Sequence, residues 1–158
     1  MTNSSSGKCW TADVGLLMIR AILCVVFVYH GSQKVFGAFD GPGMAGVVGM
    51  MQKMEMPLPV ASAWAAALAE LVGGALVGIG LLTRLAALPT AFTMFVAAFV
   101  VHGKAFGAGN GGMEYPLTLG IVLAGLILTG PGRLSLDALL LGRCCGGKCD
   151  APATTPAK

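Results

Sequence analysis

Long apolar runs separated by short polar or glycine-rich segments dominate the chain. Four runs are present: Asp13–Phe36, Val60–Leu82, Arg84–Gly103 and Glu114–Gly130. At 1.5 Å per helical residue the second run is about 34 Å long, enough to cross a hydrocarbon core of about 30 Å, and the fourth is the shortest, at about 25 Å. Backbone groups inside a bilayer must bond to one another, which requires helices, and the alternating pattern of a β-barrel is not found in the sequence. The pattern predicts an all-α, integral membrane four-helix bundle.

The connections between the runs predict two further short helices. After the first run, apolar side chains recur at helical spacing, at Met44, Val47, Val48, Met51 and Met54. This part of residues 37–59 is expected to lie flat at the membrane interface. Ser135–Gly142 follows a Gly-Pro-Gly break and predicts a short surface helix after the fourth run. Between the second and third runs, Gly80 is expected to end one helix and Thr83 to cap the next.

Composition strengthens the membrane assignment. Only 11% of the residues are charged, against about 25% in an average soluble domain. The net charge of +3 is small and dispersed, so no nucleic-acid-binding groove is expected. The composition also divides the chain into a polar tail at residues 1–12, a four-helix domain at residues 13–142, and a cysteine-containing, flexible tail at residues 143–158.

The basic residues predict an orientation. Four spans put both termini on one side, with six Lys or Arg residues: Lys8, Arg84, Arg133, Arg143, Lys148 and Lys158. The opposite connections hold three: Lys34, Lys53 and Lys104. The positive-inside rule therefore predicts cytoplasmic termini. A cleaved signal peptide is disfavoured, because the basic segment before the first run is weak and Arg20 interrupts the apolar stretch.

Ionisable side chains are rare in the predicted spans, so their positions are informative. They are Arg20, His30, Lys34, Glu70, His102 and Glu114. A charged group in hydrocarbon costs ~2.5–3.5 kcal/mol on insertion scales, so such groups usually face the bundle interior. At 100° per residue, Arg20, His30 and Lys34 share one flank of the first helix. Glu70 lies on a face of Ala and Gly where a neighbouring helix approaches closely. We expect a polar ladder in which Glu70 lies between Arg20 and His30.

This ladder has two interpretations. In the first, Arg20 and Glu70 form a buried ion pair that only fixes helix register, and both histidines are inert. In the second, a histidine that titrates near neutrality beside carboxylates relays protons or holds a quinol hydroxyl. Two histidines and a second carboxylate on the same side favour the second interpretation.

The ladder residues lie in motifs that resemble the DoxX family. Besides Arg20 and His102, the motifs are YHGSQKVFG at 29–37, AELVGG at 69–74, GLLTR at 80–84, GGMEYP at 111–116 and GPGRLSLD at 130–137. The resemblance covers about residues 14–140. It implies a four-helix protein of the bacterial inner membrane. Members of the family include a subunit of thiosulfate:quinone oxidoreductase, proteins linked to quinone or thiol stress, and partners of superoxide dismutase and a sulfurtransferase.

The resemblance also implies a site, because the polar motif residues of the family map onto the residues of the ladder. Candidate catalytic residues are His30, Glu70, His102 and Glu114. Candidate residues for holding a cofactor, with a quinone as the candidate, are Arg20, Lys34 and Tyr115.

The C-terminal cysteines depart from the family pattern. Cys144, Cys145 and Cys149 lie beside basic residues, which favour thiolates, so they are candidate metal ligands. An acylated anchor or an inert tail is the alternative, and no zinc motif is satisfied.

Three functions follow from these features. The first is a redox-associated, quinone- or thiol-linked subunit, which would be an enzyme only as part of an oxidoreductase. The second is a non-catalytic scaffold that anchors a soluble partner enzyme through the tail. The third is transport of a metal or small solute. The expected partners are the lipid bilayer and either another protein or a second copy of the chain.

Overall fold

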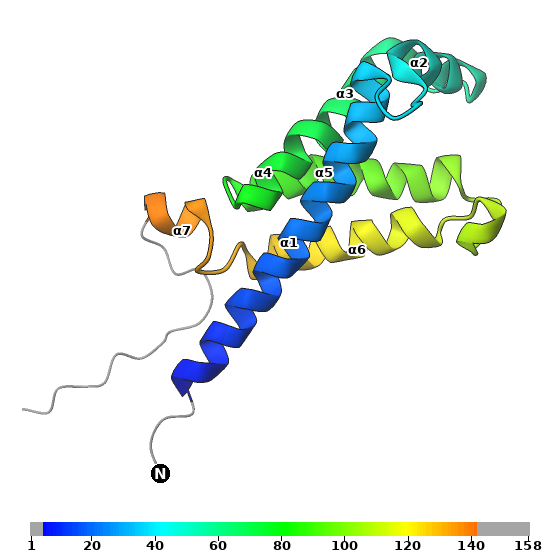
Figure 1. The fold of residues 1–158 in the computed structure, drawn as a ribbon. Coiled ribbons are helices and arrows are strands. Elements are labelled where there is room, and N and C mark those ends of the chain that lie inside the picture. Colours follow the sequence, from blue (N-terminus) through cyan, green and yellow to red (C-terminus); the bar gives the residue numbers. More distant parts are fainter. Residues whose placement is uncertain (1–4, 142–158) are drawn as a thin grey trace, which may run out of the picture.

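The computed structural model describes residues 5–141, which form a bundle of four apolar helical units (Figure 1). The units are α1 (Ser5–Phe36), α3–η1–α4 (Pro59–Leu68, Ala69–Gly73, Gly74–Ile79), α5–η2 (Thr83–Val96, Ala97–Val101) and α6 (Glu114–Thr129). The first three units are long and apolar enough to cross a membrane. The fourth has 16 residues and is therefore about 24 Å long. The all-α membrane bundle is confirmed.

The two short helices predicted in the connections are present. The Met-rich segment after α1 forms α2 (Gly43–Lys53), and α7 (Leu136–Leu141) follows α6. The backbone N–H of Ala138 donates to the Ser135 hydroxyl at 3.1 Å, which is the expected cap of α7. The first helix begins at Ser5 rather than at Asp13, because the intervening segment contains no proline and a helix can extend beyond the apolar run into water.

Two π-helical segments interrupt the second and third units. Residues 69–73 form η1, which contains Glu70, and residues 97–101 form η2, which ends directly before His102. A π turn shifts the backbone ladder and is frequent at functional sites. The Thr90 hydroxyl of α5 donates to the Ala69 carbonyl at 2.8 Å and so ties η1 to the neighbouring helix. Apolar periodicity does not reveal such segments, and neither was predicted.

Small residues let the second unit approach α1 closely. Side chains added at Gly74 and Gly78 would overlap with Phe27 and Cys24 of α1. The core beside this contact is apolar and includes Leu23, Phe27, Val77, Ala87 and Leu123. On the other side, α5 packs along α6. The glycine-rich face expected from the sequence is therefore where two helices meet.

The hairpin between α4 and α5 is capped by a residue that lies far away in the sequence. Gly80 ends α4 in the left-handed conformation, with φ +74°, as predicted. The expected cap at Thr83 is wrong: the Asp137 carboxylate accepts from the N–H groups of Leu82 at 2.7 Å and Thr83 at 3.0 Å. The Asp137 N–H in turn donates to the Gly80 carbonyl at 2.8 Å. Asp137 therefore fixes α7 onto the hairpin.

The elements divide between the two ends of the bundle. The start of α1, the α4–α5 hairpin and α7 lie toward one end, and α2 and the connection before α6 lie toward the other (Figure 1). This arrangement agrees with an even number of crossings. Which compartment each end faces stays a prediction.

Candidate functional site

One cavity in the described part of the chain is lined by four of the six ladder residues, namely His30, Lys34, Glu70 and His102. Its volume is about 220 Å³. Its walls come from α1, η1, the α5–η2 unit and α6, and its lining consists of Phe27, His30, Lys34, Glu70, Met94, Ala97, His102, Tyr115, Pro116 and Leu119. The cavity thus joins polar side chains from four helical units in an otherwise apolar setting.

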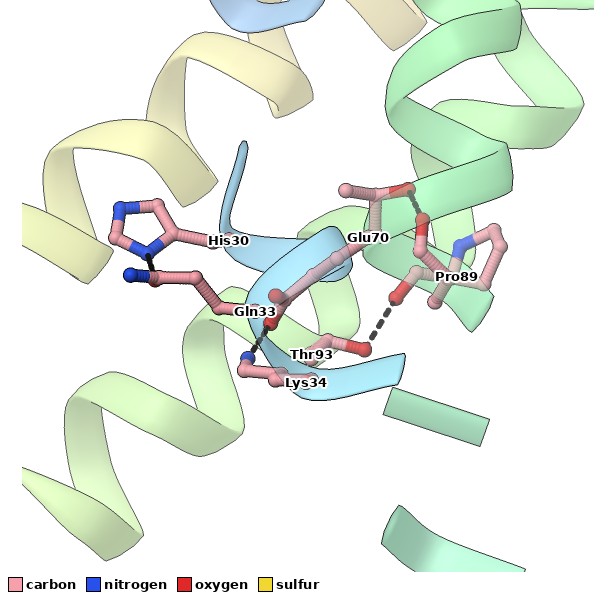
Figure 2. A network of polar contacts seen from close by, with 8 residues as sticks. His30, Gln33, Lys34, Glu70, Pro89 and Thr93 are labelled. Atoms are coloured by element: carbon pink, nitrogen blue, oxygen red, sulfur yellow. Dashed lines mark hydrogen bonds and ion pairs between the residues drawn. The ribbon is translucent and has the colours of Figure 1, made fainter. Parts of the chain in front are cut away.

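Glu70 is the acidic residue of the cavity lining, and only 1% of its surface is exposed. Lys34 at the end of α1 donates to Glu70 Oε1 and pairs with it (Figure 2). The Lys34 side chain is 27% exposed, so the pair reaches from the interior toward the surface. Glu70 Oε2 is buried and accepts no hydrogen bond. A buried carboxylate oxygen without a donor is costly, and it is a natural place for a ligand hydroxyl.

Gly31 explains why η1 can lie so close to the end of α1. A Cβ atom at Gly31 would lie 2.7 Å from the Leu71 Cα, so only glycine allows this approach. The close contact brings Glu70 to the level of His30 and Lys34. Side chains of a helix point back toward its N-terminus, so Lys34 reaches back from the last turn of α1 to Glu70.

The ion pair between Arg20 and Glu70, which the first interpretation of the ladder required, is not formed, because Glu70 pairs with Lys34. Arg20 is 1% exposed and donates from Nη2 to the Leu134 carbonyl, beside the α4–α5 hairpin. It does not line the cavity. The same helix geometry explains this, because a long side chain at position 20 extends toward the start of α1 and away from Glu70. A position of Glu70 between Arg20 and His30 would require the Arg20 side chain to extend in the opposite direction, toward the end of α1.

Both histidines line the cavity, and each is held through Nδ1. His30 Nδ1 lies 3.2 Å from Gln33 Oε1, one turn further along α1. His102 Nδ1 lies 2.8 Å from the Gly111 carbonyl. The His30 ring also packs against Tyr115 of α6, with ring centroids 6.1 Å apart. The structure therefore brings five of the sequence-predicted candidates together around one cavity, His30, Lys34, Glu70, His102 and Tyr115, and their catalytic or cofactor-holding roles stay predictions.

Glu114 lies apart from these residues. It is exposed, it does not line the cavity, and its Oε2 accepts from the Ala108 N–H at 3.0 Å. Its contact is with the connection before α6, which also carries Gly111. Glu114 thus holds the segment to which His102 is bonded.

Two residues that support the site were not predicted. Gln33 holds His30, and its signal was its place three residues after a histidine on the same helix face. Thr90 holds η1 through its hydroxyl, which a sequence pattern does not show. The metal candidates Cys144, Cys145 and Cys149 lie outside the described residues. Among the side chains that the structure describes, those of residues 10–141, there is no group of three His, Cys, Asp or Glu that could hold a metal ion.

Comparisons with known proteins identify the family of the chain. The family model of DoxX matches residues 15–103. The chain is 34% identical to the Bacillus subtilis protein named "Putative oxidoreductase CatD", over 79% of this chain and 86% of the relative. It is 34% identical to "Inner membrane protein YqjF" of Escherichia coli, over 81% of this chain and 93% of the relative.

A third relative is "Uncharacterized membrane protein Rv3486" of Mycobacterium tuberculosis, 32% identical over 84% of this chain and 86% of the relative. No solved structure matches the chain. The family model covers more than half of the chain, and each relative is covered over most of its length. The chain therefore belongs to the DoxX family of membrane proteins.

Proposed function

We propose that this protein is a redox-associated membrane subunit whose cavity binds the head group of a quinone-type molecule. The observation that carries the proposal is the cavity itself, in which the unpartnered oxygen of Glu70 and two fixed imidazoles surround a mainly apolar space. An engineered apolar cavity of about 150 Å³ binds benzene, so a cavity of about 220 Å³ suits one substituted ring.

Each polar group has a defined role in this proposal. Glu70 and the histidines bind the oxygen substituents of the ring and hold or accept protons there. Lys34 pairs with Glu70 Oε1 and leaves Oε2 for the ligand, and Phe27 and Met94 contact the apolar ring. The sequence carries no motif for a chromophoric cofactor, so the electrons come from a partner enzyme or from thiols. The word oxidoreductase in the name of the Bacillus subtilis relative supports a redox role.

The test uses the full chain in lipid nanodiscs with a short-tailed benzoquinone and its hydroquinone. His30→Ala and Glu70→Gln should each raise the Kd of the better-binding form about tenfold, which corresponds to the loss of one charge-assisted hydrogen bond. Lys104→Ala is the matched control, because Lys104 is exposed and does not line the cavity. Wild-type protein that binds neither form would contradict the proposal.

A scaffold role is the second candidate, and one observation favours it. Asp137 holds α7 and Arg20 holds Leu134, two residues before α7, against the bundle, so the chain leaves the bundle at a fixed place. A partner enzyme docked on residues 143–158 would then be held at the membrane. Deleting these residues should abolish co-purification of the partner, whereas Glu70→Gln should leave it intact. If Glu70→Gln alone releases the partner, the scaffold role is wrong.

A further inference from the structure

The hydrogen-bond partner of His102 determines which of its two ring nitrogens carries the hydrogen and which can accept a hydrogen bond. Its Nδ1 lies 2.8 Å from the Gly111 carbonyl oxygen, which can only accept a hydrogen bond. Nδ1 therefore carries the hydrogen. In the neutral imidazole Nε2 is then a lone-pair acceptor.

His30 is held in the same tautomer by a different group. Gln33 Nε2 points at the Phe39 carbonyl, 3.5 Å away, so the Gln33 amide oxygen faces the imidazole. That oxygen accepts from His30 Nδ1, and Nε2 of His30 is left as an acceptor. Figure 2 shows this second ring nitrogen on the side away from Gln33.

Glu70 supplies a third acceptor in the same cavity. Lys34 occupies Oε1 only, and Oε2 has no hydrogen-bond partner in a side chain that is 99% buried. Lys34 Nζ gives one of its three N–H groups to Glu70, and the Tyr115 hydroxyl both donates and accepts. Both donors belong to partly exposed side chains, Lys34 at 27% and Tyr115 at 45%, and a partly exposed donor costs less when it is left unbonded. The one buried atom of the lining that lacks a partner, Glu70 Oε2, is an acceptor.

We infer that the cavity selects the hydroxyl-bearing, reduced form of its ring ligand over the dicarbonyl form. The inference rests on the proposed quinone-type site and adds its redox-state preference. A hydroquinone donates two hydrogen bonds and satisfies two of the three acceptors. A quinone offers only carbonyl oxygens, which could accept from Lys34 or Tyr115 but would leave the acceptors of His30, His102 and Glu70 without donors. Each unsatisfied acceptor then keeps its cost of burial.

The test compares three probes that share one ring and one short alkyl tail: the hydroquinone, the quinone and the hydroquinone dimethyl ether. Binding to the full chain in nanodiscs is measured without oxygen. The hydroquinone should bind about tenfold more tightly than either of the others, a difference of about 1.4 kcal/mol. The dimethyl ether isolates the donated hydrogens, because it keeps the shape and electron count of the hydroquinone.

The outcomes separate this inference from the function on which it rests. Binding of all three probes with equal Kd would overturn the redox-state preference and leave the quinone-type site standing. Binding of none would overturn both.

Gln33 provides a second test, as a positioning residue outside the cavity lining. Gln33→Leu removes the acceptor that holds His30 Nδ1–H, and should lower the hydroquinone preference about threefold with little change in the Kd of the quinone. Gln33→Glu keeps an acceptor at the same place and should retain the preference. The ¹⁵N shifts of the His30 ring report the tautomer directly. A released tautomer in Gln33→Leu with an unchanged preference would contradict the role given to His30.

Discussion

The protein holds two groups of polar side chains that are bonded in different ways, one around the buried Glu70 and one around the buried Arg20. The cavity cluster consists of His30, Lys34, Glu70, His102 and Tyr115. The hairpin cluster lies beside α7 and the α4–α5 hairpin and consists of Asp13, Arg20, Thr83 and Asp137. In the hairpin cluster the hydrogen bonds run from side chain to backbone: Asp13 Oδ1, for example, accepts from the Arg133 N–H at 2.8 Å. Four buried atoms of this cluster lack a partner, Asp13 Oδ2, Arg20 Nε and Nη1 and the Thr83 hydroxyl, but their residues do not line the 220 Å³ cavity. In the cavity cluster Lys34 pairs with another side chain, and the unpartnered Glu70 Oε2 belongs to a residue that lines the cavity.

The difference separates a structural role from a binding role. Side chains that bond to turn backbone close a loop and leave no space for a ligand. Arg20, Asp13 and Asp137 do this for the segments that meet at the hairpin. Side chains that line a space and keep lone pairs free can meet a ligand. The two clusters therefore predict different effects of mutation on ligand binding: changes in the cavity cluster should weaken it, and changes in the hairpin cluster should lower stability alone.

The largest expected effect falls on Lys34, and it tests whether the cavity cluster also stabilises the bundle. Lys34→Met leaves Glu70 as a buried charge without a partner and should lower the free energy of unfolding in detergent by about 3 kcal/mol. The double variant Lys34→Met/Glu70→Leu replaces the pair with apolar groups and should recover most of this stability without recovering hydroquinone binding. A double variant as unstable as the single one would show that the pair itself is required for folding.

Arg20→Met should cost about 2 kcal/mol of unfolding free energy, because it removes the donor to the Leu134 carbonyl while filling much of the same volume. The Kd of the hydroquinone should stay within about twofold of wild type, because Arg20 does not line the cavity. The comparison fails if binding falls and stability does not. Arg20 would then belong with the cofactor-holding residues, where the sequence alone had placed it.

The different contacts of Arg20 and Lys34 show how much of the site could be predicted from the sequence. The apolar runs predicted the four helical units, and the small residues around Glu70 predicted that it faces protein. Angular position put Arg20 and Lys34 on one flank of α1, but it did not say which would reach Glu70. That depends on the backward direction of helical side chains and on the depth at which η1 meets Gly31. Asp137 as a cap is equally hidden, since it acts on a turn 54 residues earlier in the chain.

Thr90 tests the support of the cavity cluster. Its hydroxyl, with one hydrogen to donate, lies within hydrogen-bond distance of both the Ala69 carbonyl in η1 and the Ala86 carbonyl in its own helix. Thr90→Val keeps the shape and removes these bonds, so it should cost about 1 kcal/mol of unfolding free energy and weaken hydroquinone binding about threefold through η1. Thr90→Ser keeps the hydroxyl and should retain binding. Full binding by Thr90→Val would mean that helix packing alone holds Glu70 in place.

The smallest effects on stability and binding are expected at Glu114. They decide whether this residue belongs to the cavity cluster or only holds the segment before α6. Its exposed carboxylate accepts from the Ala108 N–H, which an amide oxygen can do as well. Glu114→Gln should therefore change the unfolding free energy by less than about 0.5 kcal/mol and leave the hydroquinone Kd within about twofold. Glu114→Ala removes the acceptor, loosens the segment that carries Gly111, and should weaken binding about threefold through His102. If Gln weakens binding as much as Ala does, the negative charge itself acts on the ligand, and Glu114 joins the cavity cluster.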